Sequence, residues 1–151
     1  MKKRGRFRPL SVSALSVGAT ESDQAELERI FQGIGWKLGR VSTRNEAHAF
    51  MDSTPVRVVI SERNLPAGGW REMLEDLMQR PEPPALVVTA RLADESLWAE
   101  VLNMGGFDVL AKPFDREEVT RVISAAMRRF ENERQRRLPA SSRPLVMAAA
   151  S

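Results

Sequence analysis

Three polar side chains lie at the ends of apolar runs, where they could bind or transfer an anionic group. Glu62 ends the run "VVISE", Thr89 lies near the end of "ALVVTA", and Lys112 follows "FDVLA". A carboxylate, a hydroxyl and an ammonium group can form hydrogen bonds and ion pairs with one another or with a charged ligand. Their chemistry depends on whether the fold brings the three runs side by side.

Short β-branched runs alternate with segments of helical period along the chain. After the first run, Leu27, Ile30, Phe31 and Ile34 fall at the i, i+3, i+4, i+7 spacing of an amphipathic helix. Each later run is also followed by such a segment, which predicts five strand–helix units. The predicted strands are 14–17, 36–41, 56–61, 85–90 and 107–111.

Strands that alternate with helices predict an α/β fold with a parallel sheet covered on both faces. Right-handed crossovers leave few topologies, and five strands fit the flavodoxin-like (βα)5 three-layer sandwich of order 2-1-3-4-5. Ligands of such sheets bind at the carboxyl ends of the strands. The residues expected at this edge are Gly18 and Ala19, Glu62, Thr89 and Ala90, and Lys112 and Pro113.

Composition narrows the chemistry that this edge can carry. The 151 residues include no cysteine and one histidine, which excludes a thiolate nucleophile, a disulfide framework and a cluster of histidine metal ligands. No stretch approaches the ~18 uninterrupted apolar residues of a membrane span. We expect a cytoplasmic protein with one domain at 11–130, a basic tail at 1–10 and a helical extension with a tail at 131–151.

Charge is distributed unevenly along the chain. Residues 1–10 hold five basic residues and no acidic one, and residues 128–151 hold six basic and two acidic residues. Residues 11–127 hold twelve basic and eighteen acidic residues, so the body is acidic and both ends are basic. Basic ends could bind nucleic acid with an affinity that falls with salt. Because no DNA-reading motif is visible, we interpret them as solvated tails and do not expect nucleic acid as a partner.

Three short motifs give the chain a family resemblance. In order they are "NLP" at 64–66, "TA" at 89–90 and "KPF" at 112–114. Placed on five strand–helix units, they resemble the receiver domains of two-component response regulators over residues 12–130. The resemblance implies a non-enzymatic module of phosphorelay signal transduction.

The resemblance also implies a mechanism. In the family, an aspartate at the end of the third strand accepts a phosphoryl group, and two acidic residues after the first strand help to hold magnesium. A lysine pairs with the phosphoryl oxygens, and a hydroxyl residue then bonds to the phosphate. The matching positions are Glu62 for the acceptor, Gly18 and Ala19 for the acidic pair, Lys112 and Pro113 for the lysine and its proline, and Thr89 and Ala90 for the hydroxyl and small residues.

The sequence departs from the family pattern at the metal site and at the acceptor. Gly18 and Ala19 carry no side-chain oxygen, so magnesium should bind poorly and we expect no cofactor. Glu21 and Asp23 lie nearby but are expected to point elsewhere. Glu62 is one methylene longer than the usual acceptor. We therefore predict a stand-alone, atypical receiver that is not phosphorylated in the usual way.

The role of Glu62 stays open between several alternatives. It could pair with Lys112 as a built-in mimic of the active state, or it could form a structural ion pair whose loss would leave a charge unpaired. A conventional phosphorelay receiver that accepts phosphate on Glu62 is an alternative function. A flavodoxin-like electron carrier is a second alternative, although the sequence has no tyrosine to stack on a flavin.

No output domain is visible in the chain, so we expect output through protein partners. The resemblance implies a histidine kinase or a downstream effector, and a homodimer through the fourth helix, the fifth strand and the last helix. It also implies a cis bond between Lys112 and Pro113, and it places Val109 where the family often has an aromatic switch residue. Trp70 and Trp98 are expected to be half-buried on helices, and His48 is expected to be exposed.

Overall fold

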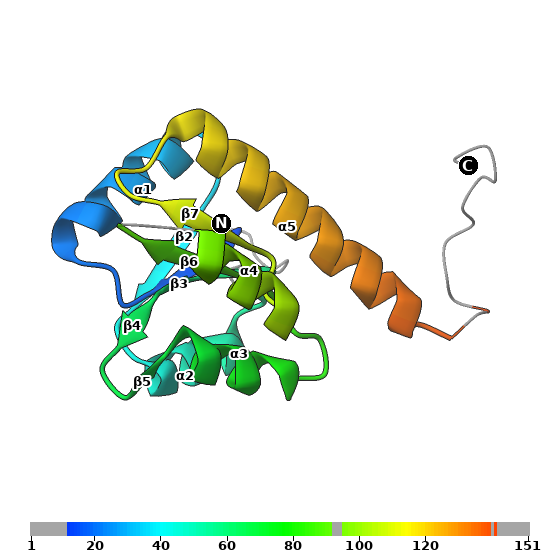
Figure 1. The fold of residues 1–151 in the computed structure, drawn as a ribbon. Helices are drawn as coiled ribbons and strands as arrows, with labels where there is room; N and C mark the ends of the chain where they lie inside the picture. The colour runs from blue at the N-terminus through cyan, green and yellow to red at the C-terminus, as the bar shows by residue number, and fades with distance from the viewer. Residues whose placement is uncertain (1–11, 92–94, 140, 142–151) are drawn as a thin grey trace.

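Within residues 12–91, 95–139 and 141, which a computed structural model describes, five helices surround a five-stranded sheet (Figure 1). The predicted tail at 1–10 lies outside the described residues. The sheet strands are β1 (Ala14–Val17), β2 (Leu38–Val41), β3 (Val58–Glu62), β6 (Ala85–Ala90) and β7 (Asp108–Ala111). The helices are α1 (Glu21–Ile34), α2 (Arg44–Ser53), α3 (Trp70–Met78), α4 (Glu95–Met104) and α5 (Arg116–Arg137).

All neighbouring strands of the sheet are parallel, in the order β2-β1-β3-β6-β7. Counted within this sheet alone, the order is 2-1-3-4-5, so the predicted topology is confirmed. The numbering skips two places because a two-stranded hairpin, β4 (Asn64–Leu65) and β5 (Gly68–Gly69), follows β3. The glycines and the proline of this segment had predicted only a loop.

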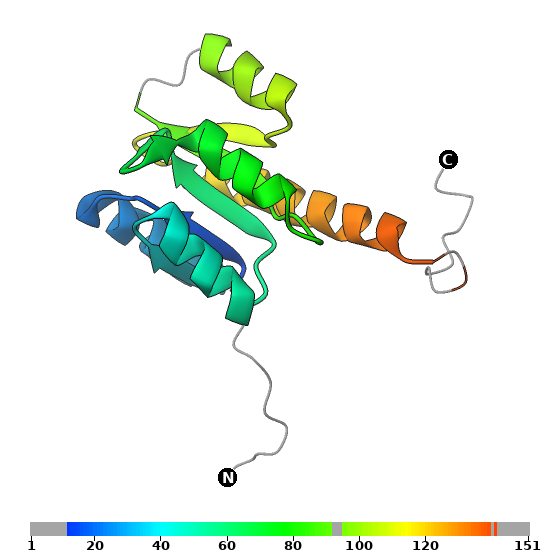
Figure 2. The same ribbon diagram turned by 90° about the horizontal axis from the view of Figure 1, so that it is seen from below.

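Helices lie on both faces of the sheet (Figures 1 and 2), and a hydrophobic core lies on each face. Helices α1 and α5 cover one face, where Leu27 and Phe31 of α1 meet Val119 and Ile123 of α5. Helices α2, α3 and α4 cover the other face. Strands β1 and β6 are buried along their whole length, and this explains why their sequences are nearly continuous apolar runs.

Helix boundaries follow the capping signals of the sequence. Thr20 accepts a hydrogen bond from the backbone N–H of Asp23, and Thr43 accepts one from that of Glu46. Asp115 begins α5 in the same way. Gly35 ends α1 with a φ of 88°, a left-handed conformation that glycine adopts without strain.

Helix α5 continues past the sheet (Figure 1). Its last buried residue is Phe130, and the following turns to Arg137 carry mostly charged residues. The predicted boundary at residue 130 therefore falls inside a continuous helix. Among the described residues, no helix is long and apolar enough to cross a membrane.

Candidate functional site

The carboxyl edge of the sheet brings together residues from four strands. In the register of the sheet, Glu62 of β3 pairs with Thr89 of β6, and Ala90 pairs with Ala111 of β7. Lys112 and Pro113 follow directly, joined by a cis peptide bond as the family resemblance had implied. Gly18 and Ala19 follow β1, which lies beside β3.

The Glu62 carboxylate is bound by a residue of β6 and by the residue that follows β7. Lys112 Nζ lies 2.9 Å from Glu62 Oε1 and 2.8 Å from Oε2. The Thr89 hydroxyl donates a hydrogen bond of 3.0 Å to Oε2. The three residues that sequence analysis had selected for their chemistry therefore converge on one point.

A fourth side chain joins the site from α1. Asp23 Oδ2 lies 3.0 Å from Lys112 Nζ, and the side chains of both residues are at least nine-tenths buried. The expectation that Asp23 points elsewhere is therefore wrong, whereas Glu21 does point away, with a side chain 90% exposed that pairs with Arg40. Asp23 turns inward because it lies on the buried face of α1.

The sequence held a signal for this position of Asp23. It precedes Leu27 by four residues and Phe31 by eight, so it extends the buried stripe of α1 by one turn. A carboxylate in the first turn of a helix also fits the positive end of the helix dipole.

Lys112 is the only buried cation among the described residues, and it binds two carboxylates. Burial of its ammonium group lowers the pKa, but the hydrogen bonds to Glu62 and Asp23 raise it by more. The pKa of Lys112 therefore lies above its ordinary value, and the group stays charged. A second cation, Arg91, lies 3.9 Å from Asp23 Oδ1 but is exposed.

The turn after β1 is shaped around a glycine. Gly18 has a φ of 84°, and a Cβ atom at this residue would lie 2.5 Å from Leu65 Cδ2 and 3.5 Å from Glu62 Cβ. A carboxylate side chain at this position would therefore require both a strained backbone and a shift of Leu65. Ala19 offers no side-chain oxygen either.

Three other residues of interest lie away from this point. Trp70 is buried, Trp98 is about half exposed with its indole N–H bound to Asp108, and Val109 is buried in β7. The prediction of a half-buried Trp98 is confirmed, whereas Trp70 is more buried than predicted.

His48 is also less exposed than predicted. Its ring contacts Asp76 of α3 and Arg80, two residues past the end of that helix, with Nε2 3.4 Å from Asp76 and Nδ1 3.1 Å from Arg80. Both partners are far from His48 in sequence, so no local pattern could have indicated this cluster.

A parallel α/β sheet with a carboxylate, a hydroxyl and a lysine at its carboxyl edge is the arrangement that the resemblance to receiver domains implies. A family model of the response regulator receiver domain matches residues 17–124. The chain belongs to the response regulator receiver domain family.

Curated relatives are whole regulators that are longer than this chain. The DNA-binding transcriptional regulator NtrC of Salmonella typhimurium is 29% identical over 112 residues, which cover 74% of this chain and 24% of NtrC. The transcriptional regulatory protein FixJ of Bradyrhizobium diazoefficiens is 30% identical over 95 residues, which cover 60% of this chain and 46% of FixJ. The chain thus spans less than half the length of either relative.

Solved receiver structures share the fold. The signal receiver domain of an HD domain-containing protein from Pseudomonas fluorescens Pf-5 matches with a TM-score of 0.72 and 23% identity, over 87% of this chain and 96% of that one. The receiver domain of a sensor histidine kinase from Pseudomonas aeruginosa PAO1 matches with a TM-score of 0.66 and 17% identity, over 78% and 98%. The latter structure contains a magnesium ion in its active site cleft.

Proposed function

We propose that this receiver domain signals without phosphorylation, with Glu62 as a permanent occupant of the phosphoryl-acceptor position. The observation that carries the proposal is the set of contacts on Glu62. Lys112 and Thr89, which match the residues that respond to a phosphoryl group in the family, both already bind its carboxylate.

The ligands that the site offers argue against magnesium binding. A receiver uses a divalent cation to neutralise the charge that builds up on the transferring phosphoryl group. Here Asp23 and Glu62 both bind Lys112, and Gly18 and Ala19 supply no side-chain oxygen. Both carboxylates already bind a lysine and the turn after β1 adds no third, so these residues do not fit a magnesium ion, which needs several oxygen ligands.

The position of Thr89 favours a mimic of the active state over a plain structural ion pair. Thr89 Oγ1 is 3.0 Å from the Glu62 carboxylate and 3.5 Å from the backbone carbonyl of Ser61. The hydroxyl is thus directed at the acceptor side chain, as the family resemblance implies for the phosphorylated state. An ion pair alone would need Lys112 but not this hydroxyl.

Acetyl phosphate tests the proposal against the conventional alternative. The full chain is incubated with acetyl phosphate and magnesium, and its intact mass is measured beside a receiver that has an acceptor aspartate. We expect the control to gain one phosphoryl group and this chain to keep its mass. A stable acyl phosphate mapped to Glu62 would establish the conventional receiver instead.

We further propose that output passes through protein contacts on the face formed by α4, β7 and α5. Trp98 and Met104 of α4 are among the few large apolar side chains that are exposed in the described residues. The hydrogen bond from the Trp98 indole to Asp108 places this ring at the junction of α4 and β7. The face fits a second copy of the chain, and a histidine kinase or an effector remains the expected partner class.

A further inference from the structure

We propose that the opposite end of the domain from Glu62 is a docking site for an acidic peptide segment with apolar side chains, supplied by a partner protein. The site comprises two depressions that meet at the loop Pro81–Pro84, and we call it the proline-loop surface. It lies at the amino ends of the strands, so it is separate from the edge that carries Glu62. The proposal is independent of how Glu62 acts.

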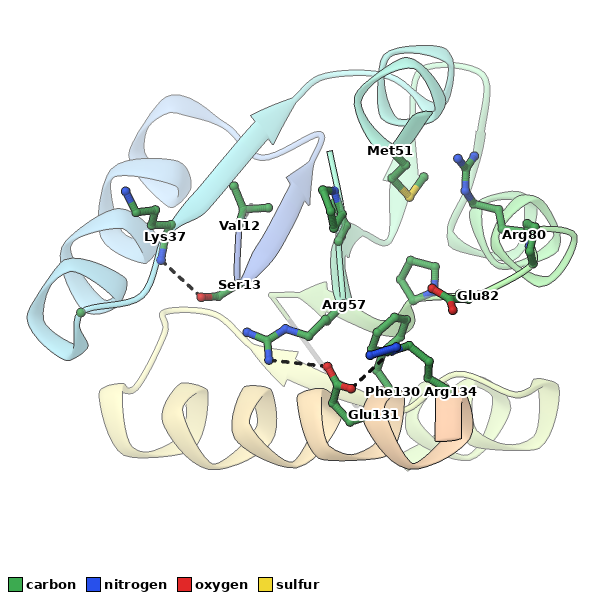
Figure 3. Close-up of a pocket in the computed structure, with 15 residues that line it drawn as sticks. Val12, Ser13, Lys37, Met51, Arg57, Arg80, Glu82, Phe130, Glu131 and Arg134 are labelled. Atoms are coloured by element: carbon green, nitrogen blue, oxygen red, sulfur yellow. Dashed lines mark hydrogen bonds and ion pairs between the residues drawn. The ribbon is translucent and has the colours of Figure 1, made fainter. Parts of the chain in front are cut away.

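The larger depression is a cavity of about 770 Å³ (Figure 3). Its lining includes Val12 and Val56 at the starts of β1 and β3, Met51 of α2 and Phe130 of α5. Val12, Val56 and Phe130 are each less than one-tenth exposed, so the apolar part of the lining is fixed in the core. A cavity of this size, with an apolar floor and polar groups at its rim, is typical of a binding site.

The smaller depression is a groove of about 310 Å³ on the side of α3 and α4. Leu74 and Met78 of α3 line it, and Met78 is 59% exposed. The cavity and the groove share Pro81, Pro84 and Phe130, so they adjoin each other. Two adjoining depressions, each lined by both apolar and polar groups, suit one extended chain that places a side chain in each.

The rim of the proline-loop surface is basic. Six cationic side chains line the two depressions, against three acidic ones. Half of these cations come from residues 11–127, which are acidic overall, and the other half come from the basic end of the chain. The cations are Lys37, Arg57, Arg80, Arg129, Arg134 and Arg137, and the acids are Glu82, Glu131 and Glu133.

Most of the rim cations are only loosely neutralised. Glu131 is shared by Arg57 at 4.0 Å and Arg134 at 3.5 Å. Glu133 is likewise shared by Arg129 at 3.9 Å and Arg137 at 4.0 Å. A charge-assisted hydrogen bond is shorter, at about 2.7–2.9 Å, so a partner carboxylate could approach these guanidinium groups more closely than their present partners.

Lys37 adds a further cation to the rim. Its backbone N–H binds the Ser13 hydroxyl (Figure 3). Within the described part of the chain, no carboxylate lies in ion-pair distance of its ammonium group. This side of the cavity therefore favours an anionic occupant.

Charge also argues against the two ends of this chain as the occupant. Residues 1–11 precede Val12 directly and hold five basic residues and no acidic one. Residues 142–151 contain one arginine and no acidic residue. Like charges repel, so neither segment complements the rim, whereas an acidic segment of another protein does.

A displayed library of random twelve-residue peptides tests the proposal on the full chain. The peptides that bind are sequenced, synthesised with a fluorescent label and measured by anisotropy. We expect acidic residues flanking apolar ones, and an affinity that weakens as salt is added. Replacement of Arg57 and Arg134 together by Glu should weaken binding at least about tenfold, or roughly 1.4 kcal/mol.

A matched pair of substitutions provides the control. Arg63 and Arg121 are exposed arginines that line neither depression. Their joint replacement by Glu changes the net charge equally and should leave the affinity within about twofold. Circular dichroism tests whether each variant is folded. Joint replacement of Arg57 and Arg134 by Ala should give a loss of affinity intermediate between the wild type and the Glu variant.

Several results would overturn the proposal. These are a library without binders, binders without an acidic excess, or equal affinity for the two Arg-to-Glu pairs. Binding of a random DNA duplex or of anionic vesicles with the same dependence on Arg57 and Arg134, in the absence of peptide binders, would assign the surface to that partner instead. Burial of this surface in a dimer of the chain would also contradict it.

Discussion

Lys112 is the buried cation at the centre of the candidate site. It lies between the carboxylates of Asp23 and Glu62, at 3.0 Å and 2.8 Å, and binds both. A buried cation with two carboxylate partners is held firmly by several charge-assisted hydrogen bonds. The residue that the family uses to sense a phosphoryl group is thus already engaged.

Replacement of Glu62 by Gln should show how much the ion pair with Lys112 contributes to stability. The variant keeps the shape of the side chain but leaves Lys112 with Asp23 alone, so we expect a loss of about 1–3 kcal/mol in the free energy of unfolding at pH 7. Denaturation by urea measures it. The same change at Glu21, whose side chain is exposed, is the control and should have little effect.

The effect of Glu62→Gln should depend on pH in a defined direction. Because the pKa of Lys112 is raised in the folded protein, the stability that it contributes is fully present below the unfolded lysine pKa of about 10.4. It is lost as pH rises through the higher folded pKa. The difference between wild type and variant should therefore shrink above about pH 10.4, and a difference that grows there would contradict this assignment.

At the scale of elements, the turn between β1 and α1 is built for a glycine. Gly18→Ala should cost about 1–2 kcal/mol for the left-handed backbone and more for the contact with Leu65. Gly35→Ala is the matched control, since Gly35 has a φ of 88° but no atom within 4 Å of its Cβ position. Urea denaturation should show the larger loss for Gly18→Ala, and equal losses would contradict the contact.

An ion pair between Arg44 and Asp76 joins helices α2 and α3. Arg44 donates hydrogen bonds of 2.7 Å and 3.1 Å to Asp76, and this pairing holds the pKa of Asp76 below its ordinary value against the opposing effect of burial. Asp76→Asn should therefore cost about 1–2 kcal/mol at pH 7. The neighbouring Glu75→Gln, at an exposed position, should cost less.

Acid should remove the stability that the Arg44–Asp76 ion pair contributes. A lowered folded pKa gives stability that is present above the unfolded aspartate pKa of about 3.9 and is lost as pH falls through the folded pKa. The difference between wild type and Asp76→Asn, measured by urea denaturation, should shrink below about pH 4. A difference that stays constant to about pH 2 would contradict the pairing.

The sequence predicted the elements better than the contacts between remote elements. Parallel α/β rules placed Glu62, Thr89 and Lys112 at one edge because apolar runs and crossovers determine strand order. The turn of Asp23 toward Lys112 was missed, because a carboxylate in the turn after the first strand was expected to point away from the site. The hairpin of β4 and β5 and the cluster at His48 depend on packing between segments, which no local pattern contains.

At the scale of the whole molecule, the two proposed contact surfaces are chemically different. The α4, β7 and α5 face presents the exposed apolar side chains of Trp98 and Met104, and the proline-loop surface presents a basic rim. Basic ends of the chain were visible in the sequence. The basic rim was not, because Lys37, Arg57 and Arg80 come from separate segments.

The apolar face predicts self-association. Sedimentation of the full chain at micromolar concentration should show a dimer, and Trp98→Ala should shift it toward the monomer, because burial of a large aromatic side chain dominates such interfaces. Trp70→Phe is unsuitable as a control because Trp70 is buried, so Met78→Ala on α3 serves instead. A monomeric wild type, or equal effects of the two variants, would contradict this face.

The most direct test of the central claim, that the site of Glu62 is closed to metal and phosphoryl group, is an amide NMR titration. Magnesium is added to the labelled full chain, followed by beryllofluoride as a phosphoryl analogue. We predict that the backbone signals of Ala19, Glu62, Thr89 and Lys112 do not move, because Lys112 and Thr89 already bind the acceptor carboxylate. Saturable shifts confined to these residues would contradict the account and establish a conventional receiver.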